Sequence, residues 1–352
     1  AQNGSIHMGE DLVVHSEADL TEFKALAGDI VIEREGTLQS SANGIVFEAA
    51  GDVVFKDDFL ASGTSFVIDA QGAVDVRDNA YVHTFFGSAQ GQTTISGAGG
   101  IHFGDNARFD TTTLTLNAGD SVTGTVADLV LGDNAQVSTT YTGIVVNATG
   151  DVTFGEKAVL KTSEDNIDHD ISLSAGNALY MGEGAVIEGM NRVYVIADNG
   201  VTLGDGASII NAAVDNWDSR TFVQSTYGDV VLGSQAVVAG QNVYIWAADE
   251  EGVNGGSVIL GDNSRIEVNS QTGTFELRAY DSAFIESRFT VESQDVVTIE
   301  TIKGDIVLGD QAAFTTAGDL TLTSGRDISL GNESMIVTSL DGDSTGHRDV
   351  RM

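Results

Sequence analysis

The sequence contains no cysteine and no proline, and only 16 lysine and arginine residues stand against 52 aspartate and glutamate residues. The absence of cysteine excludes disulfides, zinc–thiolate sites and cysteine nucleophiles. The absence of proline is less usual, because average usage of about 5% would place roughly 18 prolines in a chain of this length. A fold in which nearly every residue donates a backbone hydrogen bond would exclude proline in this way.

The shortage of basic residues leaves a formal charge of −36 at neutral pH. This charge excludes most nucleic-acid-binding proteins, which need a positive patch to follow phosphates, and it disfavours an anionic membrane surface for the same reason. No apolar run reaches the roughly 18 residues of a membrane-spanning helix, so no membrane span is predicted. With 41% hydrophobic and 19% charged residues, the chain can still bury a large core, which argues against a disordered acidic tail.

A repeated phrase dominates the sequence. The segments 150–160, 228–238 and 304–314 share the pattern Gly-Asp, two or three apolar residues, Gly, a polar pair and Ala. The turn residue of this phrase occurs fourteen times at intervals of 21 to 29 residues, at Gly9, Glu33, Lys56, Arg77, Gly104, Gly132, Gly155, Gly182, Gly204, Gly233, Gly261, Glu286, Gly309 and Gly331. Such self-similarity is typical of solenoid proteins.

Each copy contains three short stretches in which apolar and polar residues alternate, separated by three corners. Alternation indicates strands with one buried face. A propeller blade would need about 40 residues, and the signature of a leucine-rich repeat is absent. We therefore predict an all-β fold, a single-stranded parallel β-helix of about fourteen coils, right-handed by the general bias of parallel crossovers. At about 4.8 Å per coil it would be about 65 Å long.

One segment competes with this interpretation. Residues 16–27 carry Ser16 and Asp19 at the spacing of a helix capping box, but Phe23, Ala25 and Ala27 also fit the strand alternation. We expect a coil of the repeat there. The predicted β-helix covers residues 1–340, and residues 341–352 form a polar tail that we expect to be mobile.

Variation in length concentrates in the segments 161–170 and 211–220, which follow the Gly-acid-x-Ala turn, and another insertion occupies residues 249–255 at a different corner. Loops that accept insertions on a repetitive scaffold are common binding sites. In the second of these segments, Trp217 lies between Asp215 and Asp218, so we expect it to stack on a sugar ring with those carboxylates as polar partners. Trp246 lies inside an alternating stretch and is interpreted as an ordinary face residue.

The position after the turn residue is acidic in ten copies: Glu10, Asp57, Asp78, Asp105, Asp133, Glu156, Glu183, Asp205, Asp262 and Asp310. A short acceptor side chain there would satisfy turn amides. Alternatively, because stacked carboxylates repel one another, Ca²⁺ would bind between coils. The metal candidates are Asp105 and Asp133 in this column, together with Glu164, Asp165, Asp168 and Asp170 in the acidic loop. Two positions beyond the acid, small residues such as Ala107, Ala135 and Ala236 are expected to point inward at the corner.

The same loop is also the candidate catalytic site, because it adds His169 to its carboxylates. These groups supply the types of acid and base that glycoside cleavage requires. A β-helix enzyme that cleaves acidic polysaccharide also needs basic residues to bind the substrate, and only Lys161 is near. The sequence therefore predicts a protein without catalytic residues.

The phrase Leu-Gly-Asp-Asn-Ala/Ser at residues 131–135 and 260–264 resembles the large repetitive bacterial exoproteins of the filamentous-haemagglutinin-like type. The resemblance covers nearly the whole chain, although the coils here are longer and less regular. It implies export, a right-handed β-helix, and a role in adhesion, biofilm matrix or cell-surface structure. A chain that begins Ala1-Gln2 also suits an exported product.

We therefore expect a non-enzymatic extracellular structural or adhesive protein, with itself, extracellular polysaccharide or a cell surface as partners. The repeat phrase is already present at residues 3–9 and again at 327–331, and uncapped strand edges recruit other chains. Subunits would then assemble head to tail into a filament, unless the chain is an excerpt of a longer adhesin. The alternative functions are a polysaccharide-binding or polysaccharide-cleaving β-helix, and a calcium-dependent surface-layer component.

Overall fold

The computed structural model describes residues 1–17, 20–41, 44–84, 91–163, 169–213, 218–270, 272–293, 295–338 and 350–351. Every regular element among them is a β-strand, so the predicted all-β class is confirmed. No helix that could span a membrane occurs within this described part of the chain. The chain divides into two compact units, Ala1–Gly176 (unit 1) and Asn177–Met352 (unit 2).

Unit 1 is a β-solenoid whose strands form three parallel sheets, A, B and C, with seven strands in each. Sheet A contains β1 (Ile6–Met8), β4 (Ile30–Ile32), β7 (Val53–Phe55), β10 (Ala73–Val76), β13 (Gly100–Phe103), β16 (Leu129–Leu131) and β19 (Val152–Phe154). Sheet B contains β2 (Val13–Ser16), β5 (Thr37–Ser40), β8 (Leu60–Gly63), β11 (Tyr81–Thr84), β14 (Arg108–Thr111), β17 (Gln136–Thr139) and β20 (Val159–Thr162). Sheet C contains β3 (Thr21–Ala25), β6 (Ile45–Ala49), β9 (Phe66–Ala70), β12 (Thr93–Gly97), β15 (Leu114–Ala118), β18 (Ile144–Ala148) and β21 (Ile171–Ala175).

Unit 2 repeats this plan, again with seven strands in each of its three sheets. Its sheet A contains β22 (Ala178–Met181), β25 (Gly200–Leu203), β28 (Val230–Leu232), β31 (Val258–Leu260), β34 (Ala283–Ile285), β37 (Ile306–Leu308) and β40 (Ile328–Leu330). Its sheet B contains β23 (Val186–Gly189), β26 (Ser208–Asn211), β29 (Val237–Gly240), β32 (Arg265–Val268), β35 (Thr290–Ser293), β38 (Ala313–Thr316) and β41 (Met335–Thr338). Its sheet C contains β24 (Arg192–Ala197), β27 (Arg220–Ser225), β30 (Val243–Ala247), β33 (Phe275–Ala279), β36 (Val297–Thr301), β39 (Leu320–Thr323) and β42 (Val350–Arg351).

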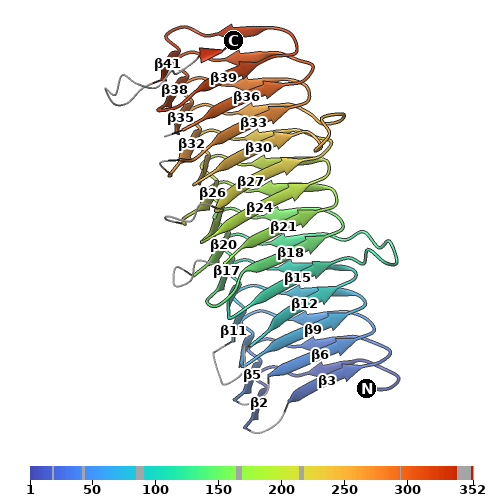
Figure 1. The fold of residues 1–352 in the computed structure, drawn as a ribbon. Coiled ribbons are helices and arrows are strands. Elements are labelled where there is room, and N and C mark those ends of the chain that lie inside the picture. The colour runs from blue at the N-terminus through green and yellow to red at the C-terminus, as the bar shows by residue number, and fades with distance from the viewer. Residues whose placement is uncertain are drawn as a thin grey trace. The chain divides into compact units, whose positions relative to one another are not determined.

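Within each unit every strand pairs in parallel with its equivalent one coil away, as Figure 1 shows, so equivalent residues stack. Leu116, for example, pairs with Val146, and Ala118 pairs with Ala148. Each unit thus contributes seven coils, close to the predicted total. In the segment with the competing helix prediction, Ser16 ends β2 and β3 follows, which confirms the strand interpretation; Asp19 lies outside the described residues. Within the predicted tail, β42 pairs with β39.

The interior of each unit is filled by the inward half of the alternation. In unit 1, the Phe55 ring lies 5.0 Å from Phe47 and 4.4 Å from Phe59, and all three side chains are buried. Burying one such side chain contributes about 1.5–3 kcal/mol, so the aromatic stack is a main source of stability in these coils. The small residues expected at the corner are buried as predicted, including Ala107 and Ala135.

The Gly-acid-x-Ala turn has a backbone geometry that explains its composition. Its third residue has a positive φ in all fourteen copies, and glycine occupies this position only at Gly184 and Gly206. The N–H of Ala107 donates to the carbonyl of Gly104 across the turn at 3.3 Å, as in a type II turn, where the third residue requires a positive φ. Asparagine, which tolerates this conformation better than most residues, fills it at Asn79, Asn106, Asn134 and Asn263.

Candidate functional site

The predicted metal residues Asp105 and Asp133 lie in a column of turns in unit 1. The Oδ1 atom of Asp105 accepts a hydrogen bond from the N–H of Asp133 at 2.9 Å, and Oδ1 of Asp133 accepts one from Glu156 at 2.8 Å. Asp78 does the same for the N–H of Asp105 at 2.9 Å. Each carboxylate therefore satisfies an amide of the next coil, which is a structural role.

A second carboxylate column precedes the strands of sheet A. In unit 1, Asp29 accepts from the N–H of Asp52 at 3.0 Å, and Asp52 accepts from Ala73 at 2.7 Å. In unit 2, Asp305 accepts from the N–H of Asp327 at 3.1 Å. Much of the acidic composition thus belongs to the scaffold, because these side chains join successive coils at two corners.

The acidic loop falls largely outside the described residues, which include neither Glu164, Asp165 nor Asp168. His169 is 1% exposed, and the carbonyl of Asp170 accepts the N–H of Ile144 at 2.9 Å. Within the described residues, no group of three or more histidine and acidic side chains is placed to hold a metal ion.

The predicted sugar-stacking loop is described only in part, since Asp215 and Trp217 lie outside the described residues. Asp218 is described, and it forms ion pairs with Arg192 and, at 2.7 Å, with Arg220. These arginines are paired with each other in register on β24 and β27 of sheet C. Asp218 therefore fixes two cations at the margin of the outer face of this sheet.

The outer face of sheet C in unit 2 carries an aromatic platform, which we define as Tyr194, Phe222, Tyr244 and Trp246. The register pairs Tyr194 with Phe222 and Phe222 with Tyr244, so three aromatic rings follow one another over three successive coils. Trp246 follows Tyr244 by two residues on β30 and therefore shares its face. All four side chains are half-buried, as expected for residues on the outer face that do not belong to the core.

The rings of the platform form a continuous cluster. The ring centroids of Tyr194 and Phe222 are 6.3 Å apart, and those of Phe222 and Tyr244 are 6.2 Å apart. The Trp246 ring lies 5.0 Å from Phe222 and 6.4 Å from Tyr244, at steep interplanar angles of 75° and 89°. Such edge-to-face contacts are the favoured geometry for aromatic pairs, and they hold the rings in fixed orientations. The platform encloses part of a hollow of about 410 Å³.

Polar groups border this hollow. Gln224 donates through Nε2 to the carbonyl of Ala248 at 2.9 Å. On the next strand, Glu276 pairs in register with Tyr244 and Arg278 with Trp246, with the Arg278 guanidinium 5.8 Å from the indole ring centre. Burial raises the pKa of Glu276 above its usual range, an effect that Arg278 partly offsets. Burial, reinforced by Glu276, also raises the pKa of Tyr244.

The inserted loop 249–255 forms one side of the hollow. Asp249 organises this loop, because its carboxylate accepts from the N–H of Val253 at 2.7 Å and from the Asn254 side chain at 3.0 Å. Glu250 lines the hollow, and its carbonyl accepts a hydrogen bond from Arg278 Nη1 at 3.3 Å. The insertion noticed in the sequence therefore lies beside the aromatic platform.

The same corner of unit 1 carries an insertion that the sequence pattern did not reveal. Asp120 and Thr125 form an antiparallel bridge, and the Asp120 carboxylate accepts from the N–H of Val122 at 2.8 Å. The outer face of sheet C in unit 1 is different, however. The second residues of its strands are Glu22, Val46, Val67, Thr94, Thr115, Val145 and Ser172. The aromatic platform is therefore particular to unit 2 and is not required by the repeat.

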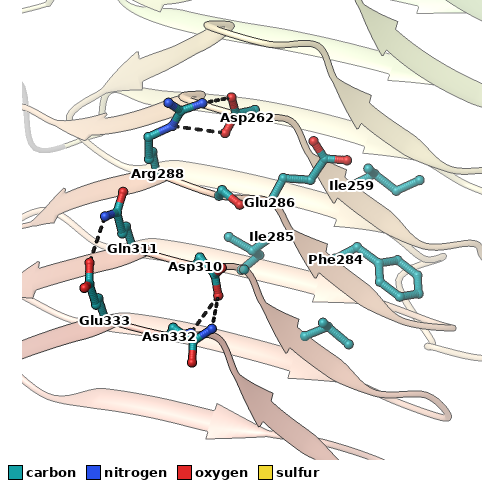
Figure 2. Close-up of a pocket in the computed structure, with 13 residues that line it drawn as sticks. Ile259, Asp262, Phe284, Ile285, Glu286, Arg288, Asp310, Gln311, Asn332 and Glu333 are labelled. Atoms are coloured by element: carbon teal, nitrogen blue, oxygen red, sulfur yellow. Dashed lines mark hydrogen bonds and ion pairs between the residues drawn. The ribbon is translucent and has the colours of Figure 1, made fainter.

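A second hollow, of about 1040 Å³, lies on the outer face of sheet A in unit 2 (Figure 2). Polar side chains occupy one side of it, where Arg288 forms an ion pair with Asp262 and Gln311 donates to Glu333 at 2.8 Å. Ile259 and Phe284 occupy the other side, as Figure 2 shows. This hollow contains the acidic repeat positions Asp262 and Asp310, whose carboxylates bind arginine and asparagine side chains of neighbouring coils.

Comparison with known proteins adds no relative to this description. No protein-family model matches the chain, and no curated protein or solved structure matches it either. The assignment of the fold as a β-solenoid therefore depends on the pairing of the strands alone, and this pairing is that of a β-helix repeat protein.

Proposed function

We propose that this chain is a non-catalytic adhesive protein of a cell surface or extracellular matrix, and that it binds an extended polysaccharide along the aromatic platform of unit 2. The single observation that supports this proposal most strongly is the ladder of aromatic rings on three successive coils, at positions that face away from the core.

Two properties of the platform favour a sugar chain. The rings offer flat apolar surfaces, on which the C–H faces of a pyranose can stack, while Tyr194, Tyr244 and Glu250, which line the hollow, supply polar groups for its hydroxyls. The coils repeat about every 4.8 Å and the ring centroids on successive coils are 6.3 and 6.2 Å apart, spacings comparable to the length of one sugar unit in an extended chain. An oligosaccharide running along the coils would therefore meet one aromatic ring per sugar.

Charge favours a neutral polysaccharide. The cations beside the platform are already compensated, since Arg220 pairs with Asp218 and Arg278 lies 3.7 Å from Glu300. The chain as a whole carries −36 charges, so an acidic polysaccharide would be repelled at long range. The resemblance of the repeat to haemagglutinin-like exoproteins supports the extracellular setting of this proposal.

The test uses the intact protein and a set of soluble neutral and acidic polysaccharides. The chain has two tryptophans, so Trp217→Phe leaves Trp246 as the only indole reporter. Binding of a neutral polysaccharide should then change the emission of Trp246, and affinity electrophoresis should give a Kd that Tyr244→Ala and Trp246→Ala each weaken by about tenfold.

The matched control is Tyr180→Ala, which removes an exposed tyrosine from the outer face of sheet A in the same unit. This variant should bind polysaccharide like the parent protein. Equal affinity of Trp246→Ala and the parent, or binding of none of the polysaccharides, would contradict the proposed site. Release of reducing ends from any bound polysaccharide would instead show that the protein is an enzyme.

A further inference from the structure

The outer face of sheet A in unit 2 carries an apolar stripe, which we define as Val231, Ile259, Phe284 and Val307. These are the central residues of four successive strands, and the register pairs each of them with the next. Phe284 is 41% exposed, and three of the four residues line the hollow of Figure 2. The stripe is thus a continuous apolar surface that crosses four coils.

Acidic residues follow one side of the stripe and lie at its two ends on the other side. On one side the hollow is lined by Asp262, Glu286, Asp310 and Glu333, with Arg288 as the only cation among its lining residues. On the other side, Asp229 and Asp305 directly precede β28 and β37, the first and last strands of the stripe, whereas Ser257 and Ser282 precede the two middle strands. An apolar centre with an acidic border along one side and acidic residues at both ends of the other is complementary to a partner with an apolar centre and basic flanks.

The equivalent positions of unit 1 lack this continuity. There the central outward residues of successive strands include Val54, Asp75, His102 and Val130, and His102 Nδ1 lies 3.1 Å from Asp75 Oδ1. A polar pair therefore interrupts the apolar surface. The uninterrupted stripe of unit 2 is consequently a local feature of four coils and does not follow from the solenoid architecture.

Two classes of occupant are disfavoured by charge. A second copy of the chain would bring another −36 charges against the acidic borders, and an anionic lipid surface would be repelled in the same way. A basic peptide segment is attracted. Its conformation follows from spacing: one anchor per coil requires a repeat of about 4.8 Å, close to the helical pitch of about 5.4 Å, whereas same-face residues of an extended strand are about 6.7 Å apart.

We propose that the apolar stripe of unit 2 docks a basic amphipathic helix of a partner protein, lying along the coils with one apolar residue over each of them. Phe284 is the central anchor because it is the largest and most exposed member of the stripe, and aromatic anchors dominate such contacts. This site is separate from the aromatic platform, which lies on sheet C.

The probe is a fluorescein-labelled synthetic helix with leucine on one face and lysine on the other, and its binding to the intact protein is measured by fluorescence anisotropy. We expect Phe284→Ser and Ile259→Ser each to weaken binding by at least about tenfold. Val54→Ser, the matched change on the outer face of sheet A in unit 1, should leave the affinity unchanged. The circular dichroism of each variant should match that of the parent protein.

Three further peptides complete the test. A permuted peptide of the same composition, which has no apolar face, and a version with central prolines, which cannot form a helix, should both bind at least tenfold more weakly. A glutamate version should not bind. Equal binding of the permuted or the proline peptide, or an unchanged affinity of Phe284→Ser, would overturn the proposal, and self-association abolished by Phe284→Ser would assign the stripe to a second copy. Unchanged polysaccharide binding in Trp246→Ala would contradict only the proposed function, and unchanged peptide binding in Phe284→Ser would contradict only the docking site, so the two hypotheses fail separately.

Discussion

The carboxylate column of unit 1 allows a direct test of what the acidic repeat position does. Asp133 donates its N–H to Asp105 and accepts the N–H of Glu156, so it occupies the middle of the column. The informative pair of variants is Asp133→Asn and Asp133→Ala. Both remove the charge, but only asparagine keeps a carbonyl oxygen at the position of Oδ1.

The magnitudes decide between the two functions considered for this position. Two carboxylates about 4.8 Å apart repel each other in water by about 0.9 kcal/mol, and physiological salt reduces this value. A hydrogen bond from an amide to a charged acceptor contributes about 1.5–3 kcal/mol, less at an exposed turn. The hydrogen bond thus outweighs the repulsion without a bound cation, and we expect the amide-acceptor role on this ground.

We therefore expect Asp133→Asn to have the stability of the parent within about 0.5 kcal/mol. Asp133→Ala should be about 1 kcal/mol less stable than Asp133→Asn, because it lacks the acceptor. Urea unfolding followed by circular dichroism measures this difference, first in chelator and then in millimolar calcium at matched ionic strength. A calcium-bridged column would instead be stabilised by the metal, and Asp133→Asn would lose that gain. Equal stability of the two variants, or a calcium gain confined to the parent, would refute the amide-acceptor role.

Asp205 in unit 2 provides the matched control. It accepts the N–H of Ser234 at 2.8 Å, so its neighbour in the following coil carries no charge. Asp133 has acidic neighbours in both directions, and neutralising it relieves two repulsions. Asp205→Asn should therefore gain less stability than Asp133→Asn, in proportion to the smaller number of like-charged neighbours.

Three further predictions test other parts of the structure. Gly206→Ala should lower the free energy of unfolding by about 1 kcal/mol, because Gly206 has a φ of +66°. Steric crowding does not contribute, since no atom lies within 4 Å of the new Cβ. Gly9→Ala, where φ is not positive and the Cβ is equally free, should be neutral or stabilising in the same urea titration. Burial raises the pKa of Glu276 in the folded protein, so the stability that protonated Glu276 contributes is fully present below the usual pKa of glutamate and is lost as pH rises through the raised pKa. Glu276→Gln should therefore show a smaller fall in Tm between acidic and neutral pH than the parent. Parallel curves of Tm against pH would contradict the raised pKa. Phe55→Ala should lower the unfolding free energy by about 3–5 kcal/mol, whereas Phe284→Ala should change it by less than about 0.5 kcal/mol, and similar losses would show that Phe284 belongs to the core.

The architecture was predictable because its signals are local. Alternation within four or five residues indicates each strand, and glycine followed by an acid indicates each corner, so the number of repeat copies gives the number of coils directly. The ambiguous segment at residues 16–27 was resolved by the same rule, since Phe23 and Ala25 continue the inward positions of β6, where Phe47 and Ala49 are buried. The positive φ at the third turn residue could also have been predicted, from asparagine or glycine at six of the fourteen copies.

The aromatic platform was not predicted, although all of its residues were visible. Trp246 was interpreted as an ordinary face residue, because one strand alone does not show which side chains lie beside it on neighbouring coils. The signal appears only when the three strands are aligned on their buried residues, Val195, Val223 and Ile245. This alignment places Tyr194, Phe222 and Tyr244 beside one another on the outer face. The insertion at Asp120 was missed for a related reason, since Gly119-Asp120 imitates an ordinary corner of the repeat.

The two outer faces of unit 2 show how this scaffold separates structure from recognition. The coils are joined by backbone pairing, by inward side chains and by the carboxylates of two corner columns. The outward side chains of the strands therefore contribute little to the stability of the solenoid. Asp and Glu already fill the corners, and any ligand must approach through their negative field. The proposed neutral sugar chain on sheet C would be little affected by that field, whereas the proposed basic helix on sheet A would gain from it. If both proposals hold, the same acidic corners that build the solenoid also select which ligand chemistry each face accepts.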